Sequence, residues 1–591
     1  MPLSVALKVP YGLGLWTESP GIPLIGSYRY RHRAPKARLP YFFLMALRDS
    51  NIAKLDSGVF DVLIVGGGIN GAVSAAALAS RGARVAVIDR GDFAGFTSMH
   101  SSNLVWGGFK YMENYELRLV RNLCKSRNHL IKAYPANLRE IRFLGALDNN
   151  SPYPPWFAGL GATAYWVIGN LFTQPPAILS AEKIHNIEPV VRTDNLLGGI
   201  EYSDAYIVDN DSRFVFGFIR SALNSGAVCA NYVELQGAER RDGLWHARLR
   251  DTDSGTEFTA TAKTIVNAAG PFVDQVNEAH DITTAHRIVY SKGIHLIVPR
   301  IADAERVLAF FDDTQRLFYV IPMGPCSVIG TTDERVTDPV THVTKEDRDF
   351  LLEQINERLA LEEPITPDQI ISARCGVRPL VVEAHDNSSD DVDWTSLSRK
   401  HAMESDRDKA WISIFGGKLT DCVNIGHEVC EEIAELGIQL SKDRKSWYGE
   451  PPKATRTEFF RQARLMGLDR VRQGKSYETL ATRLWRRYGL RAFAMLEAIR
   501  DDPRMAQDVI SGADYVRAEL FYAAQTEMVT KLDDFLRRRS KIALVIDNDQ
   551  IENADGIHEA CRLLFGDDAK RRYDEYFTAD RREELTELRA T

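Results

Sequence analysis

The residues with the clearest chemical meaning are the glycines of one short turn, which reads GGGING from position 66 to 71. Gly66, Gly68 and Gly71 have the spacing G-x-G-x-x-G, in which the first glycine permits a tight turn and the second lets backbone approach a pyrophosphate. The third lets a helix pack closely on a strand, and the start of that helix then faces the phosphate charge. Asp89, about 20 residues past the glycines, stands where a carboxylate holds ribose hydroxyls. Together these residues predict a dinucleotide-binding site.

Three further segments carry groups that suit the same site. The turn 97–103 (TSMHSSN) is rich in hydroxyls, which bind phosphate and ribitol oxygens. Residues 264–270 (TIVNAAG) form a buried strand that ends in small residues, where backbone can pass against a cofactor. Lys418, within 416–420 (GGKLT), precedes a helical pattern, so that a cation and a helix N-terminus point into the same crevice. Positive charge there stabilises an anionic reduced flavin, which favours FAD over NAD.

Apolar runs in the sequence predict the strands and helices that must position these groups. Residues 60–65 (FDVLIV) are typical of a buried parallel strand, and 84–88 (RVAVI) form a second one. Between them, 72–80 (AVSAAALAS) has the small residues of a helix packed close to a sheet. Residues 411–415 (WISIF) and the helical pattern at 422–432 repeat the order of strand, glycines and helix. This order predicts a Rossmann-like unit.

Composition places the chain among globular proteins. Its 591 residues are 45% hydrophobic and 26% charged, which allows a large core and excludes wholesale disorder. A net charge of −8 and a pI of about 6.0 argue against nucleic-acid binding. The seven cysteines form no CxxC pair and predict reduced thiols in a cytosol-facing compartment. The sequence has no EF-hand loop, HExxH motif or Cys/His cluster, so we predict no metal site.

Two segments bear on contact with a membrane. A basic stretch, 28–38, and the short apolar run 41–47 resemble a targeting signal only superficially, because no cleavage site follows. We interpret 1–55 as an N-terminal extension that is disordered or not native, with Met45 as the natural start. Residues 151–181 lack charged side chains, and we expect a buried or capping helix there, with a membrane-interface surface as the alternative. No apolar run is long enough for a conventional spanning helix.

Most of the sequence resembles the FAD-dependent glycerol-3-phosphate dehydrogenases, a family of flavoproteins related to D-amino-acid oxidase and glutathione reductase. The matching stretches are FDVLIVGGGINGA, TSMHSSNLVWGGFKYME, TIVNAAGPFVD, SKGIHLIVPR, FYVIPMGPCSVIGTTD, CGVRPL and IFGGKLTD. The late segment YVRAELFYAAQTEMVTKLDDFLRRRSKIAL resembles the family's helical C-terminal domain. The resemblance runs in family order from about Phe60 to about Val545.

The resemblance implies a site for a small phosphorylated polyol, whose dianion suits arginine because the planar fork binds phosphate bidentately. The implied substrate and catalytic residues are Arg378, Arg399, Lys418, Lys110, Tyr111 and His295. The implied FAD-binding residues are Gly66, Gly68, Asn70, Gly71, Asp89, Arg90, Thr97, Ser98, Ser101, Ser102, Asn103, Gly107, Gly108, Val233, Ala269, Gly270, Gly417, Lys418, Leu419 and Thr420. The alternatives are a structural ion pair for Arg378, a solvated loop position for Arg399 and a satisfied core histidine for His295.

Two positions depart from the family pattern. The family reads HGGxRY where this chain has WGGFKY at 106–111. Trp106 replaces a histidine that is a candidate general base, and an indole cannot accept a proton from a substrate hydroxyl. Lys110 replaces an arginine, which keeps the charge but loses the fork. The remaining candidates for the base are His295, His100 or a lysine with a lowered pKa.

We predict an α/β fold with a discontinuous Rossmann-like FAD-binding domain, an antiparallel-sheet substrate domain and a C-terminal helical domain. The first two interleave over 56–440, with FAD-binding parts at 60–137, 200–271 and 411–437. Runs such as 316–321 and 327–330 are expected in the substrate sheet. A linker at 441–452 leads into the helical domain, 450–591, whose basic triplet 537–539 we interpret as a solvated helix face rather than a lipid contact.

The resemblance implies hydride transfer from sn-glycerol 3-phosphate to FAD, giving dihydroxyacetone phosphate, with electrons passed to a membrane quinone or to oxygen. Trp106 and Lys110 leave two alternatives open, namely another phosphorylated polyol or a flavin-binding protein without turnover. We expect a cytoplasmic protein that binds no nucleic acid. Peripheral contact with the inner face of the membrane and a homodimer are left open.

Overall fold

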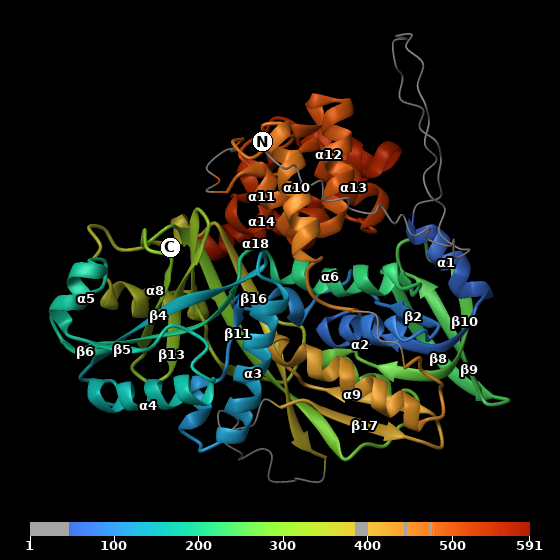
Figure 1. Cartoon of the computed structure of the whole chain (residues 1–591), viewed down its shortest axis with the longest axis horizontal. Coiled ribbons are helices and arrows are strands. Elements are labelled where there is room, and N and C mark those ends of the chain that lie inside the picture. The colour runs from blue at the N-terminus through green and yellow to red at the C-terminus, as the bar shows by residue number, and fades with distance from the viewer. Residues whose placement is uncertain (1–46, 385–399, 443–445, 472–475, 477, 591) are drawn as a thin grey trace, which may run out of the picture. The chain divides into compact units, whose positions relative to one another are not determined.

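The computed structural model describes residues 47–384, 400–442, 446–471, 476 and 478–590 (Figure 1). Arg399, one of the expected substrate ligands, lies outside the described residues, as does the expected start at Met45.

The first sheet is built around β1 (Val59–Val65), which pairs in parallel with β2 (Val85–Ile88) and β10 (Glu257–Asn267). Among the described residues it has eight strands, six of them in the order β17-β18-β10-β1-β2-β7. The outer members are β17 (Ala402–Asp406), β18 (Trp411–Phe415), β7 (Val228–Ala230), β8 (Val233–Arg241) and β9 (Leu244–Asp251). The predicted strands at 60–65, 84–88 and 411–415 are confirmed.

Helices cover one face of this sheet, where α2 (Ile69–Ser80) packs against α6 (Asp211–Asn224) and α9 (Cys422–Glu435) (Figure 1). Every residue of α2 from Asn70 to Ser80 is buried, which explains why its sequence uses alanine so heavily: two helices and a sheet must approach it closely. The β8–β9 hairpin and α1 (Leu47–Ser57) contribute the core on the other face.

Helix α1 corrects the expectation of an extension up to residue 55. Its Arg48 donates to both carboxylate oxygens of Asp251, at 2.8 and 3.1 Å, and Asn51 donates to the carbonyl of Cys229 at 2.8 Å. These contacts tie residues 47–57 to the first sheet, so this helix belongs to the FAD-binding part of the chain.

The second sheet is mostly antiparallel and, within the described residues, has ten strands. Eight follow the order β15 (Glu334–Val336), β11 (His286–Pro299), β14 (Cys326–Gly330), β13 (Leu317–Met323), β12 (Arg306–Phe311), β4 (Leu138–Asp148), β6 (Leu196–Ile207) and β3 (Leu104–Val105). Strand β16 (Ser372–Glu383) pairs with β11, and β5 (Ala177–Leu179) pairs with β6. The predicted antiparallel runs are confirmed as β13 and β14, whereas 200–207 belongs to this sheet and not to the FAD-binding part.

Five helices accompany the second sheet and its junction with the first. They are α3 (Leu117–Ala133), α4 (Pro155–Ile168), α5 (Ala181–Ile187), α7 (Val273–Glu278) and α8 (Lys345–Arg358).

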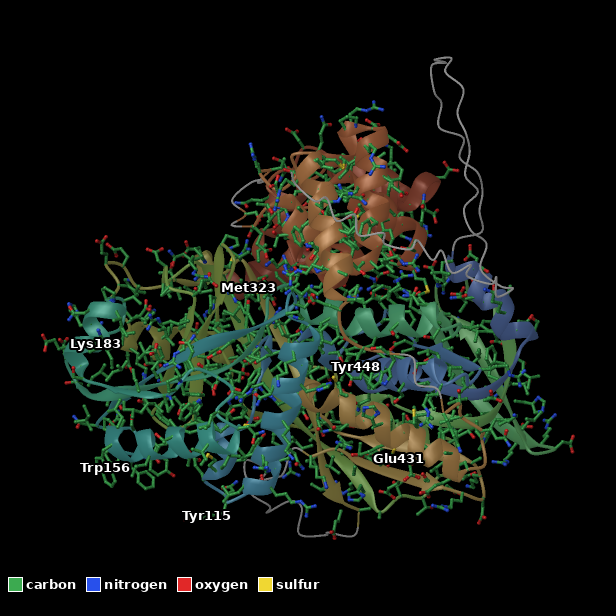
Figure 2. The ribbon with its side chains drawn as sticks, viewed as in Figure 1. Tyr115, Trp156, Lys183, Met323, Glu431 and Tyr448 are labelled. Carbon is green, nitrogen blue, oxygen red and sulfur yellow. The ribbon has the colours of Figure 1, made fainter. Side chains whose placement is uncertain are left out.

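Helix α4 forms where a buried or capping helix was expected, and it packs against β6 with one side while its outer face stays exposed. Only Gly159, Ala162 and Tyr165 are buried. The side chains of Trp156 and Leu160 are about 60% exposed, and Figure 2 shows Trp156 at the outer edge of the molecule. No helix among the described residues is long and apolar enough to cross a membrane.

The chain ends in a bundle of helices, drawn in orange and red in Figure 1. They are α10 (Lys453–Leu465), α11 (Leu480–Tyr488), α12 (Ala492–Asp501), α13 (Arg517–Thr526), α14 (Ile542–Val545), α15 (Asn548–Glu552), α16 (Ile557–Phe565), α17 (Ala569–Tyr576) and α18 (Ala579–Arg589). Between α13 and α14 lies a π-helical turn, Asp534–Arg539. The basic triplet 537–539 is in this turn and is buried, so its interpretation as a solvated face is wrong.

Candidate FAD and substrate site

A cavity of about 560 Å³ opens at the carboxyl ends of β1, β2 and β10. Of the expected FAD-binding residues, its wall includes Gly66, Gly68, Asn70, Asp89, Arg90, Thr97, Ser98, Val233, Ala269, Gly270 and Gly417. These residues come from five separate parts of the sequence, and the parallel strands bring them to one edge, which is where open α/β sheets bind ligands.

The glycine turn has the geometry that its spacing predicts. Gly66 has φ of +104°, and a Cβ there would lie 2.5 Å from the carbonyl oxygen of Ala268. A Cβ on Gly71 would lie 1.8 Å from the carbonyl oxygen of Gly66, so the third glycine is needed for α2 to pack on the turn. Larger residues at these positions would close the cavity or displace the helix.

Asp89 organises the backbone around the cavity. Its carboxylate accepts hydrogen bonds from the N–H groups of Gly67, at 2.7 Å, and Gly91, at 2.9 Å, and its carbonyl accepts from Val233 at 2.7 Å. Burial raises the pKa of the carboxyl, against the opposing effect of the two backbone donors. The side chain is therefore fixed in the wall, at the position expected for the ribose contact.

The hydroxyl-rich turn divides into two parts. Thr97 and Ser98 line the cavity, and the Ser98 hydroxyl accepts from the N–H of Ile69 at 3.0 Å. Ser101 instead donates to Asp211 at 2.7 Å, and the Asn103 amide donates to the carbonyls of Ile207 and Asp209. These two side chains hold the turn in place and are not among the residues of the cavity wall.

Two expected glycines near this turn are required by the local geometry. A Cβ on Gly107 would lie 2.1 Å from the Tyr165 hydroxyl, and Gly108 has φ of +87°. Neither glycine, nor Ser102, Leu419 or Thr420, is among the residues of the cavity wall.

The chemistry of the cavity fits FAD. Its wall combines a glycine cradle, hydroxyls, a carboxylate and small residues. The amide oxygen of Asn70 is buried and has no hydrogen-bond partner among the described residues. Arg90 stacks over the ring of Phe272 at 3.9 Å, and both line the cavity, giving it one aromatic wall that suits a flat ring. Phe272 was not expected as a site residue, although it directly follows the small residues at 268–271 in the sequence.

The C-terminal helices contribute a buried ionic network beneath the cavity. Asp92, in the wall, accepts from Arg538 Nε and from two nitrogens of Arg539, each at 2.8 Å. Burial alone would raise the pKa of Asp92, but the guanidinium groups of Arg539 and Arg538 outweigh it and hold the pKa below its ordinary value. Arg537 also donates to the carbonyl of Met99, at 3.4 Å. No local sequence signal identifies this network, because its partners are more than 430 residues apart.

Two expected substrate-site residues, Lys418 and Tyr111, meet where the segment before α9 approaches the WGGFKY turn. The Lys418 ammonium donates to the Tyr111 hydroxyl and lies 3.9 Å from the Tyr111 ring centroid and 5.9 Å from that of Trp106. The hydroxyl of Thr420 donates to the carbonyl of Trp106 at 3.2 Å. Lys110 is half-buried on the same turn. The structure thus joins the two glycine motifs that the sequence separates by about 300 residues.

Arg378 lies on β16, opposite Ser291 of β11. Its guanidinium pairs with Asp333 at 3.2 Å and donates to the Thr331 hydroxyl at 2.7 Å. A Cβ on Gly293 would lie 2.1 Å from Arg378 Nη2, so the glycine provides the space for the guanidinium. Pro379, the next residue, lines the cavity, which places this end of β16 beside the cofactor site.

His295 lies on β11 opposite Arg374 and is only 3% exposed. Neither ring nitrogen has a hydrogen-bond partner among the described residues, which argues against a satisfied core histidine. Burial, with added repulsion from Arg374 and Arg378, holds its pKa well below the usual range. The imidazole is therefore neutral near pH 7, and its unprotonated nitrogen can accept a hydrogen bond from a substrate hydroxyl. His100 has a similarly lowered pKa from burial and nearby arginines.

Within the described ranges there is no group of three or more His, Cys, Asp or Glu side chains that could hold a metal ion.

A Rossmann-like domain with this cavity, an antiparallel sheet beside it and a helical C-terminal domain together define a flavin-dependent oxidoreductase. The model of the FAD dependent oxidoreductase family matches residues 61–393, and that of the C-terminal domain of alpha-glycerophosphate oxidase matches 456–572. The chain belongs to the FAD dependent oxidoreductase family. The expectations of the fold class and of FAD as cofactor are confirmed.

Similar proteins extend over nearly the whole chain. The glycerol-3-phosphate dehydrogenase of Pseudomonas tolaasii is 29% identical over 507 residues, covering 84% of this chain and 94% of that protein. The aerobic glycerol-3-phosphate dehydrogenase of Escherichia coli K12 is 29% identical over 504 residues, covering 83% and 95%. The structure of the Bacillus halodurans glycerol-3-phosphate dehydrogenase complexed with FAD has a TM-score of 0.69 at 22% identity, covering 92% of this chain and 98% of that one, and it supports the fold.

Proposed function

We propose that the protein oxidises sn-glycerol 3-phosphate to dihydroxyacetone phosphate with FAD as the oxidant. The observation that carries this proposal is that two paired strands hold both groups: β11 carries a neutral histidine, His295, and β16 carries Arg378, whose charge acts on His295 and whose neighbour Pro379 lines the cofactor cavity. A phosphorylated secondary alcohol requires both a cation for its phosphate and a base for its hydroxyl. The names of the similar proteins from Pseudomonas and Escherichia support the same substrate.

Each residue has a separable task. The glycine turn, Asn70 and Asp89 would hold FAD, and the bound flavin would supply the acceptor for a hydride from the carbinol carbon. His295 takes the hydroxyl proton, so that loss of the hydride and the proton leaves a ketone. Arg378 binds the phosphate bidentately through its guanidinium group. To do so it gives up part of its contact with Asp333, because the phosphate dianion carries more negative charge than the carboxylate. Lys418, held by Tyr111, supplies fixed positive charge for the developing alkoxide.

The residues Trp106 and Lys110 favour a second candidate, a larger phosphorylated polyol. The Trp106 and Tyr111 rings lie 5.7 Å apart, so the turn presents an aromatic surface where the family has a histidine. Lys110 holds a phosphate as a point charge and sets its orientation less strictly than arginine does.

The test is anaerobic mixing of the purified yellow protein with glycerol 3-phosphate, followed by the absorption band of oxidised flavin. Rapid bleaching is expected for the wild type and for His100→Gln, and a rate lower by about 10²- to 10⁴-fold for His295→Gln at equal FAD content. If the wild type holds FAD but does not bleach, glycerol 3-phosphate is not the substrate. A panel of longer polyol phosphates then tests the second candidate.

We also infer a peripheral membrane contact through the exposed face of α4, from which electrons pass to a quinone. Trp156, Phe157, Leu160 and Val167 expose apolar surface on a helix that has no charged residue. Such a face suits the membrane interface, where tryptophan is favoured.

Flotation with phospholipid vesicles tests this contact. The double variant Trp156→Asp/Leu160→Asp should lose vesicle binding, whereas Val340→Asp/Leu490→Asp, which alters equally exposed apolar residues elsewhere, should keep it. Equal binding by both variants contradicts the assignment to α4. Reoxidation of the reduced protein by a soluble quinone or by oxygen, compared at equal concentration, identifies the acceptor.

A further inference from the structure

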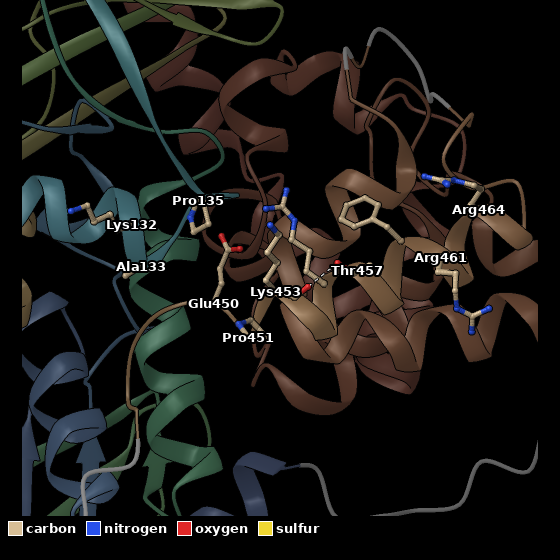
Figure 3. A pocket seen from close by; sticks show the side chains of 11 residues that line it. Lys132, Ala133, Pro135, Glu450, Pro451, Lys453, Thr457, Arg461 and Arg464 are labelled. Carbon is tan, nitrogen blue, oxygen red and sulfur yellow. Dashed lines mark hydrogen bonds between the residues drawn. The ribbon is translucent and has the colours of Figure 1, made fainter. Parts of the chain in front are cut away.

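A second cavity, of about 680 Å³, lies between the end of α3 and the start of α10 (Figure 3). One wall is formed by residues 132–135, which belong to the part of the chain that carries the FAD cavity. The other is the first turns of the C-terminal helical domain and the segment before it, residues 450–464. The cavity shares no residue with the FAD cavity.

The charge of this cleft is strongly positive in a chain whose net charge is −8. The cations in its wall are Lys132, Lys453, Arg456, Arg461 and Arg464, against the single carboxylate of Glu450. That carboxylate is already engaged, because it accepts from the N–H of Ala136 at 2.5 Å, and the Glu450 N–H donates to the carbonyl of Ala133 at 2.8 Å. Glu450 therefore joins the two walls of the cleft. The five cationic side chains of the lining outnumber this single carboxylate.

The cations differ in how far they are neutralised. Arg461 pairs with Glu458 at 2.7 Å, and Arg464 lies 3.6 Å from Asp469. Lys453 and Arg456 form no ion pair with any residue in the described part of the chain, although the Arg456 guanidinium lies 5.8 Å from the ring centroid of Phe460. Like charges gathered in a cleft raise the local concentration of an oppositely charged ligand. Arginine and lysine together suit phosphate oxygens.

The rest of the lining is apolar. Phe460 lines the cleft, together with Ala133, Pro135 and Pro451. We propose that this cleft binds a multiply charged phosphate compound, with an apolar or flat portion of that compound against Phe460. The source is either a soluble phosphate ester or the headgroup of an anionic phospholipid, which share this chemistry.

The test uses the full-length protein with FAD bound and two kinds of probe. Isothermal titration with ATP and with tripolyphosphate detects a soluble ligand, and the difference between them reports the contribution of the flat ring. Flotation with phosphatidylglycerol vesicles, compared with phosphatidylcholine vesicles, detects a headgroup.

The informative variant is Lys453→Glu/Arg456→Glu, and its control is Lys183→Glu/Arg500→Glu, which makes the same charge change at exposed residues outside the cleft. Figure 2 marks Lys183 on α5. Binding of ATP that weakens at least tenfold in the first variant but not in the control assigns a soluble ligand. Loss of the preference for phosphatidylglycerol in the first variant alone assigns a headgroup.

The proposal is overturned if the wild type binds no probe, or if both variants lose binding equally. Both variants should retain FAD and be bleached by substrate at the wild-type rate. The binding tests and the flavin-bleaching test are therefore independent. Failure of the phosphate-binding proposal does not contradict the proposed oxidation, and failure of the oxidation does not contradict binding in the cleft.

Discussion

Replacement of Asp92 by asparagine should loosen both the cofactor site and the C-terminal domain. The carboxylate is fully buried and receives three hydrogen bonds of 2.8 Å from Arg538 and Arg539. In Asp92→Asn the charge is lost while both guanidinium groups stay buried. Arg538 retains Asp533 and Asp534, whereas Arg539 is left with uncharged partners, the carbonyl of Glu527 and the ring of Phe216. Removing one partner of a buried pair costs about 3–5 kcal/mol.

The expected shift in melting temperature depends on the entropy of unfolding, which scales with the number of residues that unfold. For about 550 residues that melt together, the unfolding entropy is about 1.2 kcal/mol/K at roughly 2.1 cal/mol/K per residue, so this loss lowers Tm by about 3–4 °C. Differential scanning fluorimetry, with flavin fluorescence as a second channel, measures unfolding and FAD release together. FAD should dissociate at a lower temperature than in the wild type, because Asp92 is part of the cavity wall.

The matched control is Asp313→Asn, the same chemical change at a pair with Arg358 in which Asp313 is 60% exposed. Exposed pairs contribute about 0–1 kcal/mol, so its melting temperature should move by less than about 1 °C. If Asp92→Asn melts and releases FAD like Asp313→Asn, the reasoning from buried charge is refuted.

Two further predictions concern single residues. Burial alone would lower the pKa of His401, but hydrogen bonds from its ring nitrogens to Asp421 and Glu428 outweigh this and raise the pKa to about 9. The two ion pairs of protonated His401 therefore add about 3 kcal/mol to the free energy of unfolding below pH 6.5, at about 1.36 kcal/mol per pKa unit. This contribution is lost as the pH rises to about 9. Melting curves of the wild type and His401→Gln should differ at pH 6 and coincide near pH 9.5; a constant difference contradicts the pairing. Gly293→Ala should displace Arg378 and raise the KM for glycerol 3-phosphate about 10- to 100-fold, through the loss of about 1–3 kcal/mol of charge-assisted contact. An unchanged KM would show that Arg378 does not bind the phosphate.

The elements around the glycine turn were predictable because their signals are local. A β-branched run, three spaced glycines and an alanine-rich helix each report on neighbours within a few residues, and β1, α2 and β2 follow from them. The antiparallel pair β13 and β14 was equally readable from two short apolar runs. FAD followed from the same local motifs together with the later GGKLT turn.

The features that could not be predicted have a common physical origin, which is that sequence does not show what covers a surface. The uncharged segment of α4 is apolar on all sides, and only the fold reveals that one side is left uncovered. The triplet 537–539 was interpreted as solvated because three consecutive arginines usually are. Here the π-helical turn directs two of them to Asp92, whose charge makes their burial tolerable. Ser101 and Asn103 bind protein groups that lie about 100 residues later.

The ties between Asp92 and the π-helical turn have a consequence for biosynthesis. Asp92 and Arg539 are separated by 447 positions, so the ribosome makes the cavity wall long before the groups that neutralise it. The strand β18 and the Lys418 turn likewise arrive after most of the first sheet. A nascent chain that stops before residue 534 carries a buried carboxylate without its counter-ions and a flavin pocket without its underside. We therefore expect stable capture of the cofactor to be a late event, and a chain that ends before residue 534 to hold FAD less tightly, because Asp92 in the cavity wall lacks its two arginines.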